Sequence, residues 1–480
     1  MKYKFLLTPH SSLITTRLSS IAIIGLGRVG RFVSQYLMHN QNYVYGYDDK
    51  KNVFIQRENK PLVNNKLFKP IADYQLITKN KKLSFAVCSP GIADMHRAVQ
   101  TLKRNKIPIF DEIEFTYNQL INSKTRSVDE AMRTSTQKLR NSLIAITGTN
   151  GKSTTTSLIG HILDTAGKNV FWGGNLAPGL PFVVALFQEP KEYYVLETSS
   201  FQLQRTYKFH PHITVLLNIT ADHLDRHKCL SEYREAKFKI FANQTKNDYA
   251  VINYEDITSM GFRNLIPSRK IYFSRYRRTN GAYLYRNYIY FKKERICRID
   301  EVKLLGSHFI DCILSAVTVV KLIGIKNHII KNTLRNFVGL EHRLEFIAEI
   351  DNVKYINNSM CTNPSAGVKT LQAFNKPVIL IAGGKEKNLE VDDYIKEISK
   401  KSRLTILLGD NRKRLGHLLD KIQYSNYILA DSLNQAVHIA REKSKLNEIV
   451  LFSPGFASFD NFANFQERGN AFKEIVYALA

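Results

Sequence analysis

Residues 146–156 read Ile-Thr-Gly-Thr-Asn-Gly-Lys-Ser-Thr-Thr-Thr and follow the apolar, strand-like run Leu143–Ile146. A glycine-containing turn between a strand and a helix lets backbone N–H groups approach a phosphate, and a lysine followed by a hydroxyl adds a charge and a Mg²⁺ ligand. A general P-loop has a glycine five residues before Gly151, where this chain has Ile146. A plain strand-to-helix connection is the alternative, but the spacing of Gly151, Lys152 and Ser153 favours phosphate binding.

The bulk composition predicts a globular, multidomain protein. At 480 residues the chain is long enough for roughly three domains. Its five cysteines are scattered without a C-x-x-C pair, which favours a reducing compartment, and no apolar run reaches the ~18 residues of a membrane helix. We therefore expect a cytoplasmic protein without stable membrane insertion.

The net charge of +27 is typical of a protein that binds a polyanion. The basic residues are spread along the whole chain rather than gathered in one segment. We therefore expect no nucleic-acid partner.

The N-terminal part opens with a βαβ pattern. The apolar run Ser20–Ile24 leads into Gly-Leu-Gly-Arg-Val-Gly at 25–30, and a second run, Tyr43–Tyr47, ends in two aspartates. By itself this pattern predicts a dinucleotide site, although a lone G-x-G-x-x-G is a weak signal. A further strand, Phe85–Cys88, runs into Ser-Pro-Gly.

The middle and C-terminal parts continue the α/β pattern. Strands are expected at Tyr193–Leu196, Ile213–Leu217 and Ala250–Ile252, and after about residue 340 at Val378–Ala382, Leu404–Leu408 and Ile449–Phe452. The polar segment at about 122–142 is the best linker candidate. We predict three α/β domains: a Rossmann-like domain at 1–121, a central P-loop domain with a mostly parallel sheet at 122–339, and a Rossmann-like domain at 340–480.

An aromatic hairpin is predicted at residues 282–291. The two tyrosine-rich runs Ala282–Tyr285 and Tyr288–Phe291 flank Arg286-Asn287. Such tyrosines resemble a stacking platform for single-stranded nucleic acid, but cross-strand aromatic pairs explain them without a ligand.

Three further stretches contain candidate metal ligands that could act together with the phosphate loop. Glu197 ends a strand, where a second Mg²⁺ contact is expected, and Asp222 and His223 follow another strand. In the helix predicted at Ser231–Asn243, Lys237 lies within the apolar stripe. A desolvated lysine amine reacts with CO₂ to form a metal-binding carbamate, whereas the alternative is a lysine that extends to the rim.

The chain resembles the Mur ligases in the motifs that it carries and in their order. These motifs are the phosphate loop, Glu197–Leu203, Asp222–Arg226 and His342-Arg343, and the likeness covers nearly the whole chain. The C-terminal motifs Ser453–Phe462 and Glu467–Asn470 resemble the member that adds D-glutamate. The resemblance implies an ATP-dependent, ADP-forming amide ligase of peptidoglycan synthesis that acts as a monomer on UDP-N-acetylmuramoyl-L-alanine and D-glutamate. It also implies an acyl-phosphate intermediate and closure of the C-terminal domain. The alternatives are a sister ligase for another amino acid and a weakly active homologue that serves as a binding protein. A nicotinamide-dependent oxidoreductase is a remote alternative, because it would not explain the phosphate loop at residues 147–153.

The resemblance also assigns residues. ATP is held by Gly148, Thr149, Asn150, Gly151, Lys152, Ser153, Thr154, His342, Arg343 and Asn358. Two Mg²⁺ are held by Ser153, Glu197, His223 and carbamylated Lys237. The nucleotide-linked substrate is held by Arg28, Val29, Asp48, Asp49, Lys50, Ser89, Pro90, Gly91 and Asn175. D-Glutamate is held by Thr362, Lys387, Ser458 and Phe465. The catalytic groups are Lys152, His223, Lys237 and Arg343.

The chain departs from the family pattern around the far end of ATP. Asn358 and Met360 stand where the family has an acid and a lysine, and Phe309 and Cys312 stand where the family has the two asparagines of a His-Asn-x-x-Asn motif that reads His308-Phe309-Ile310-Asp311-Cys312 here. Losing a phosphate-contacting lysine costs ~1–3 kcal/mol of charge-assisted bonding. We therefore expect weaker ATP binding than is usual in the family.

Overall fold

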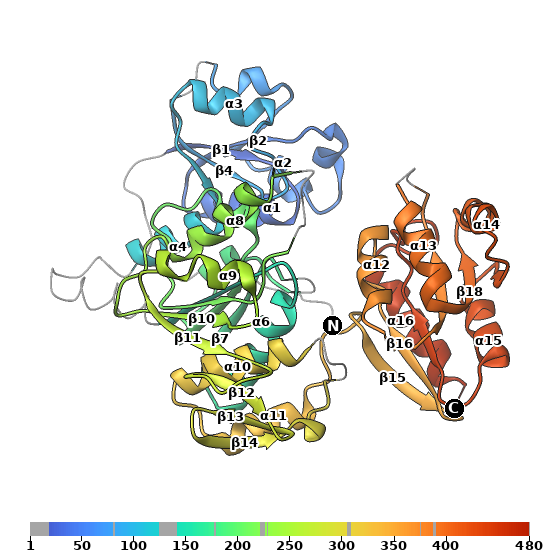
Figure 1. The fold of residues 1–480 in the computed structure, drawn as a ribbon. Coiled ribbons are helices and arrows are strands. Elements are labelled where there is room, and N and C mark those ends of the chain that lie inside the picture. Colours follow the sequence, from blue (N-terminus) through green and yellow to red (C-terminus); the bar gives the residue numbers. More distant parts are fainter. Residues whose placement is uncertain are drawn as a thin grey trace. The chain divides into compact units, whose positions relative to one another are not determined.

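The computed structural model describes residues 19–79, 82–123, 142–176, 179–220, 226–227, 229–304, 309–374, 376–386 and 390–479. The chain forms two compact units. Unit 1 consists of the described residues within Met1–Glu301 and Phe309–Arg335, and unit 2 of those within Val302–His308 and Asn336–Ala480. Unit 1 contains two parallel sheets and a small antiparallel one, and unit 2 contains one mixed sheet (Figure 1).

The first sheet of unit 1 is parallel and has the order β3-β2-β1-β4-β5. Its strands are β1 (Ser20–Ile24), β2 (Tyr43–Tyr47), β3 (Phe68–Ile71), β4 (Leu83–Cys88) and β5 (Ile109–Asp111). The helices of this segment are α1 (Arg28–His39), α2 (Lys60–Val63), α3 (Arg97–Arg104) and α4 (Glu112–Ser123). The strands predicted at 20–24, 43–47 and 85–88 are confirmed, because short apolar runs buried on both faces are typical of parallel strands.

The second sheet has the order β11-β10-β9-β6-β8-β7 and is also parallel. Its strands are β6 (Leu143–Thr147), β7 (Val170–Gly174), β8 (Tyr193–Glu197), β9 (Ile213–Leu216), β10 (Tyr249–Asn253) and β11 (Arg269–Phe273). The helices around it are α6 (Lys152–Thr165), α7 (Ser200–Leu203), α8 (Leu230–Phe238), α9 (Ile257–Gly261), α10 (Ile310–Leu322) and α11 (Asn327–Asn336). Most of the linker predicted at about 122–142 lies outside the described residues, and the proposed domain boundaries stay a prediction.

The predicted hairpin is confirmed as β12 (Ala282–Tyr285) and β13 (Tyr288–Phe291), to which β14 (Glu294–Arg298) adds a third antiparallel strand. Arg286 and Asn287 both have positive φ, 46° and 66°, as a two-residue hairpin turn requires. Tyr283 stacks on its cross-strand partner Tyr290 with ring centroids 5.4 Å apart. The tyrosines therefore form the cross-strand pair expected of a hairpin that needs no ligand.

The sheet of unit 2 has the order β15-β16-β20-β17-β18-β19, and only the β15–β16 pair is antiparallel. Its strands are β15 (Glu345–Ile350), β16 (Val353–Asn357), β17 (Val378–Gly383), β18 (Ser402–Leu408), β19 (Tyr427–Leu429) and β20 (Ile449–Phe452). Its helices are α12 (Pro364–Gln372), α13 (Asp392–Lys401), α14 (Arg412–Lys421), α15 (Leu433–Lys443) and α16 (Phe465–Tyr477). The three predicted strands of this region are confirmed.

The two parallel sheets of unit 1 are joined through a buried acid on α4. Glu114 is fully buried, and its carboxylate accepts hydrogen bonds from the backbone N–H groups of Tyr207 (3.0 Å), Lys208 (2.9 Å) and Phe209 (3.0 Å). These residues lie between α7 and β9 of the second sheet. One carboxylate thus satisfies three backbone donors of the other half of the unit.

The described residues contain no helix that is long and apolar enough to cross a membrane.

We predict that Glu114→Ala destabilises unit 1 by about 3 kcal/mol, because three backbone N–H groups lose a charged acceptor in a buried place. Urea unfolding followed by circular dichroism measures the loss. The control is Glu192→Ala, which removes a carboxylate from an exposed pair with Lys168 and should cost less than about 1 kcal/mol. Equal losses in the two variants would contradict a special role for Glu114.

Candidate active site

The predicted phosphate loop lies between β6 and α6, at the carboxyl edge of the second sheet. Gly148 and Gly151 have φ values of +154° and +85°, and Gly151 is the N-cap of α6. A Cβ at Gly148 would lie 3.0 Å from the Cβ of Leu217, so both conformation and space require glycine there. Asn218 braces the loop, since its Oδ1 accepts from the N–H of Asn150 at 2.9 Å. The loop therefore presents the positive end of a 14-residue helix to an anion.

Two lysine ammonium groups meet at the loop. Lys152 Nζ donates to the carbonyl oxygens of Gly148 (3.0 Å) and Thr149 (2.9 Å), and Lys237 Nζ donates to the same Gly148 oxygen at 2.8 Å. Two cations that share one carbonyl repel each other, and an anion between them removes that repulsion. The arrangement therefore favours a multiply charged ligand such as a nucleotide phosphate.

Lys237 does not extend to the rim, so that alternative is wrong. Its side chain is 1% exposed and its Nζ lies 4.5 Å from the ring centroid of Tyr233. The predicted helix is also shorter than expected: α8 ends at Phe238 and continues as the 3₁₀ turn Lys239–Phe241. The predicted apolar stripe is nevertheless buried, and Lys237 lies within it with its ammonium group hydrogen-bonded to the carbonyl of Gly148.

Glu197 lies at the end of β8, in register with Ile146 of β6. It is 3% exposed, and its Oε1 accepts from Asn175 Nδ2 at 3.2 Å. Its Oε2 is buried and has no hydrogen-bond partner among the described residues. A buried carboxylate oxygen without a donor is costly unless a cation neutralises it. Oxygen ligands are those that Mg²⁺ prefers, so Glu197 fits a metal ligand beside Ser153.

The second predicted metal position is only partly described. His223 lies outside the described residues, as does Lys387 of the predicted D-glutamate site. Within the described ranges, no three histidine, cysteine, aspartate or glutamate side chains converge on one point.

The first sheet brings the predicted nucleotide-sugar residues to one edge. Asp48 accepts from the N–H groups of Leu26 (2.8 Å) and Lys50 (3.0 Å), while Ser89 Oγ donates to the Gly25 carbonyl at 2.8 Å. Asp48 thus braces the turn that carries Arg28 and Val29. Its carboxylate is used for backbone bonds, which weakens the prediction of a dinucleotide ribose contact.

Asp49 is held by two side chains that sequence reasoning missed. The Tyr47 hydroxyl donates to it at 2.7 Å, and His96 Nε2 lies 2.8 Å from its other oxygen. Both partners hold the pKa of Asp49 below its usual range, the Tyr47 hydrogen bond being the larger effect. Nothing in the sequence pattern links His96 to a residue 47 positions earlier.

Arg226 is a second residue that sequence reasoning left without a role. Its guanidinium donates to the carbonyls of Gly91 (2.9 Å) and Pro90 (3.4 Å) and lies 4.5 Å from the ring centroid of Phe201. The last residue of the predicted Asp222–Arg226 motif thus ties the Ser89–Gly91 turn of the first sheet to α7 of the second.

In unit 2, the predicted ATP residues lie on either side of the β15–β16 pair, since His342 and Arg343 precede β15 and Asn358 follows β16. His342 is 1% exposed, and burial lowers its pKa. Its Nδ1 lies 3.1 Å from Asn357 Nδ2. The predicted amide at Asn358 is fully engaged: Nδ2 donates to Thr370 Oγ1 (2.9 Å) and Ser453 Oγ (3.1 Å), and Oδ1 accepts from the Leu344 N–H (3.2 Å). Asn358 therefore braces the segment just after His342-Arg343.

The predicted D-glutamate residues that the structure describes gather at the carboxyl edge of the same sheet. Thr362 follows β16, Ser458 follows β20, and Phe465 begins α16. The Ser359 hydroxyl donates to the Phe465 carbonyl at 2.8 Å, which links the first and third of these segments. The carboxyl edge of an α/β sheet is where ligands bind.

The departures Phe309 and Cys312 lie at the start of α10, and Cys312 lies next to the phosphate loop. Cys312 Sγ is 3.6 Å from the Gly151 carbonyl, and Asp311 forms an ion pair of 2.5 Å with Arg275. The carboxylate thus pairs with an arginine of the same unit, and the thiol packs on the loop.

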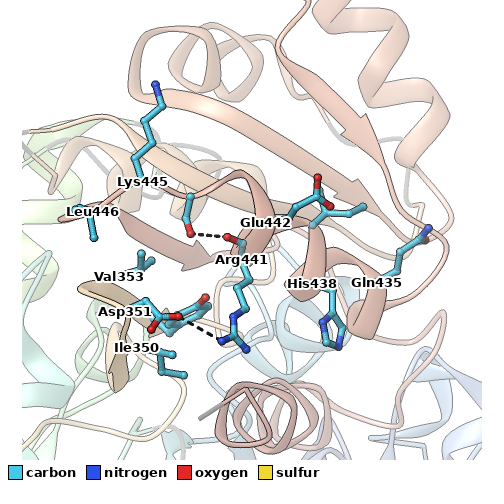
Figure 2. Close-up of a pocket in the computed structure, with 12 residues that line it drawn as sticks. Ile350, Asp351, Val353, Gln435, His438, Arg441, Glu442, Lys445 and Leu446 are labelled. Carbon is cyan, nitrogen blue, oxygen red and sulfur yellow. Dashed lines mark hydrogen bonds and ion pairs between the residues drawn. The ribbon is translucent and has the colours of Figure 1, made fainter.

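A cavity of about 850 Å³ in unit 2 does not belong to this site (Figure 2). It lies between the β15–β16 turn and the end of α15, where Asp351 pairs with Arg441 at 3.3 Å. Val353 starts β16 in its wall. The cavity is therefore at the amino end of that strand, whereas Asn358 and Thr362 follow its carboxyl end.

Comparison with known proteins matches both units. The family described as the Mur ligase middle domain matches residues 146–320, and the family described as the Mur ligase, glutamate ligase domain matches residues 342–456. The chain is 35% identical to UDP-N-acetylmuramoylalanine–D-glutamate ligases of Caldanaerobacter subterraneus subsp. tengcongensis, covering 96% of this chain and 98% of that one, and of Pelotomaculum thermopropionicum, covering 96% and 97%. In fold it is similar to the MurF ligase of Thermotoga maritima in complex with ADP, with a TM-score of 0.56, 14% identity, and 99% and 100% of the chains covered.

We predict that Gly469→Ala lowers the stability of unit 2 by about 2 kcal/mol, because a Cβ there would lie 2.2 Å from His342 Nδ1. Thermal unfolding measures the loss. Gly261→Ala is the control, since nothing lies within 4 Å of a Cβ added at that helical glycine. An unchanged unfolding midpoint in Gly469→Ala would show that the His342 ring has room to move.

Proposed function

Because the chain belongs to the Mur ligase family, we propose that it joins D-glutamate to UDP-N-acetylmuramoyl-L-alanine in an ATP-dependent reaction that releases ADP and phosphate. The observation that carries this assignment is the 35% identity, over 96% of the chain, to ligases named for that reaction. The product is an amide, and the step belongs to peptidoglycan precursor synthesis.

The chemistry follows from how a carboxylate is activated. The alanyl carboxylate attacks the γ-phosphorus of ATP, the bond to ADP breaks, and an acyl phosphate forms. The glutamate amine then attacks the acyl carbon, loses a proton, and expels inorganic phosphate. Negative charge builds in both steps, so fixed positive groups lower both barriers.

We assign the binding of the ATP phosphates and the transfer of the phosphoryl group to unit 1. Lys152 and the N–H groups of residues 148–154 bind the ATP phosphates, and the Lys152 ammonium group supplies positive charge where the phosphoryl group transfers. Ser153 and Glu197 would hold one Mg²⁺, and His223 with carbamylated Lys237 a second; bound metal neutralises charge on the phosphates. The unpaired Oε2 of Glu197 supports the first metal position.

We assign the remaining roles as follows. The edge of the first sheet (Arg28, Val29, Asp48–Lys50 and Ser89–Gly91), together with Asn175, binds the nucleotide-linked substrate. His342, Arg343 and Asn358 of unit 2 serve ATP, and Thr362, Lys387, Ser458 and Phe465 serve D-glutamate. These roles correspond to domains at 1–121, 122–339 and 340–480. The protein works in the cytoplasm, where ATP and UDP-linked sugars are made, as a monomer without a nucleic-acid partner.

We predict that phosphate release from ATP in the presence of UDP-N-acetylmuramoyl-L-alanine requires D-glutamate and is not supported by L-glutamate. A coupled phosphate assay with D-glutamate, L-glutamate or no amino acid tests this. Lys152→Ala should lower the rate at least about 100-fold, because it removes a charge at the transferring phosphoryl group. Release independent of any amino acid would exclude ligase function, and release driven by a different amino acid would indicate a sister ligase.

We predict that Met360→Lys lowers the KM for ATP about tenfold, because it restores a charge-assisted phosphate contact. Steady-state kinetics at saturating D-glutamate measure it. Lys354→Met, at an exposed position near the amino end of β16 and so away from the site, is the control for a change of one charge in unit 2. A KM for ATP that Met360→Lys leaves unchanged would show that the methionine does not weaken ATP binding.

A further inference from the structure

Arg468 is a buried arginine whose role the proposed function leaves open. It lies in the first turn of α16, within the Glu467–Asn470 motif, and is 2% exposed. Its Nε donates to Ser359 Oγ at 3.1 Å and its Nη2 to the Ser359 carbonyl at 2.9 Å. Its third nitrogen, Nη1, is buried and has no hydrogen-bond partner among the described residues.

The positive charge of Arg468 is not neutralised by direct contact. None of the ion pairs among the described residues includes it, and both of its hydrogen-bond acceptors are neutral oxygens of Ser359. Asp460 acts on it only at longer range. Burial lowers the pKa of Arg468 to about 10, so it stays charged at neutral pH. A buried cation without a counter-ion is costly, and a protein usually retains one only where an anion completes the site.

The residues around Arg468 indicate which ligand site its charge serves. Ser359, which holds the guanidinium, also donates to the carbonyl of Phe465, and Thr362 is three residues further along the same loop. On another side, a Cβ at Gly384 would lie 3.2 Å from Arg468 Nη1 and 2.5 Å from the Ala457 carbonyl, next to Ser458. The guanidinium is therefore linked to the segments that carry the three described residues assigned to the incoming amino acid.

We propose that Arg468 is a specificity-determining residue, whose unneutralised charge makes the amino-acid site of unit 2 select a substrate carrying an extra carboxylate. The inference rests on the proposed function for the identity of the site. Arg468 acts through the segments that it contacts: Nη1 lies close to the backbone of Gly384, where a Cβ would be 3.2 Å from it, so the guanidinium is near enough for its field to act on a carboxylate bound at these segments. Low polarisability around a buried charge strengthens that field.

The test compares Arg468→Met with Arg468→Lys in the full-length protein. We expect Arg468→Met to raise the KM for D-glutamate about 10- to 100-fold, while the KM values for ATP and the UDP-linked substrate change less than about threefold. Arg468→Lys, which keeps the charge, should recover at least half of that loss on a logarithmic scale. Amino-acid-dependent phosphate release gives all three constants.

A second measurement separates electrostatic selection from a structural role. The ratio of kcat/KM for D-glutamate to that for D-glutamine and for D-isoglutamine, in which one carboxylate is an amide, should fall at least about tenfold in Arg468→Met for one of the two analogues. That analogue identifies the carboxylate that the charge serves. Unchanged ratios for both analogues, with only a lower unfolding midpoint, would overturn the proposal.

The matched control is Lys473→Met. It removes a cation from the same helix, but that charge is already paired with Glu341 and Glu345 at 3.2 and 3.1 Å. We expect the KM for D-glutamate to change less than about twofold, and an increase equal to that of Arg468→Met would overturn the proposal.

A wild-type protein that releases no phosphate with D-glutamate would instead contradict the proposed function. If Arg468→Met does not fold, the same ratios measured for Arg468→Gln, which also removes the charge, decide, and ratios equal to the wild type would overturn the proposal.

Discussion

The carbonyl oxygen of Gly148 is the point on which the chemistry of unit 1 depends. It accepts hydrogen bonds from Lys152 of α6 and from Lys237 of α8, two helices that are far apart in the sequence. Gly148 must be glycine because its φ is +154° and Leu217 leaves no room for a Cβ. One backbone atom therefore fixes two lysine side chains at the positive end of α6, where we assign the ATP phosphates.

Buried charges that lack full neutralisation recur at the places where we assign ligands. Glu197 keeps one oxygen without a donor at the phosphate loop, and Arg468 keeps one nitrogen without an acceptor near the amino-acid residues. Glu114 is the contrasting case, since three backbone donors satisfy its carboxylate and it serves the packing of the two parallel sheets. Asp111 and Glu112 also keep an unpaired buried oxygen where no ligand is assigned, and burial raises the pKa of both carboxyl groups, so an unpaired atom supports a ligand site only together with the residues around it.

Much of the fold could be predicted, because parallel strands that are buried on both faces have short, continuous runs of apolar residues in the sequence. Strands at 20–24 and 43–47 have the predicted bounds, and the hairpin turn at Arg286-Asn287 has the predicted geometry. The helix at 231–243 was predicted too long, because the apolar periodicity continues through the 3₁₀ turn Lys239–Phe241. Periodicity reports which face is buried and is less sensitive to how tightly the last turn is wound.

Part of the site could likewise be predicted from the sequence, and part could not. The sequence by itself determined the phosphate loop, the family and the residues that stand at the strand ends, because glycine, lysine and hydroxyl positions near one another in the chain define a local backbone geometry. Only the tertiary structure decided that Lys237 is buried rather than extended to solvent, that His96 holds Asp49, that Arg226 clamps the Ser89–Gly91 turn, and that Arg468 lies uncompensated near the amino-acid residues. Those outcomes depend on contacts across 47 to 135 positions of the chain, and the free energy of a buried charge is set by the neighbours that folding brings to it rather than by its neighbours in sequence.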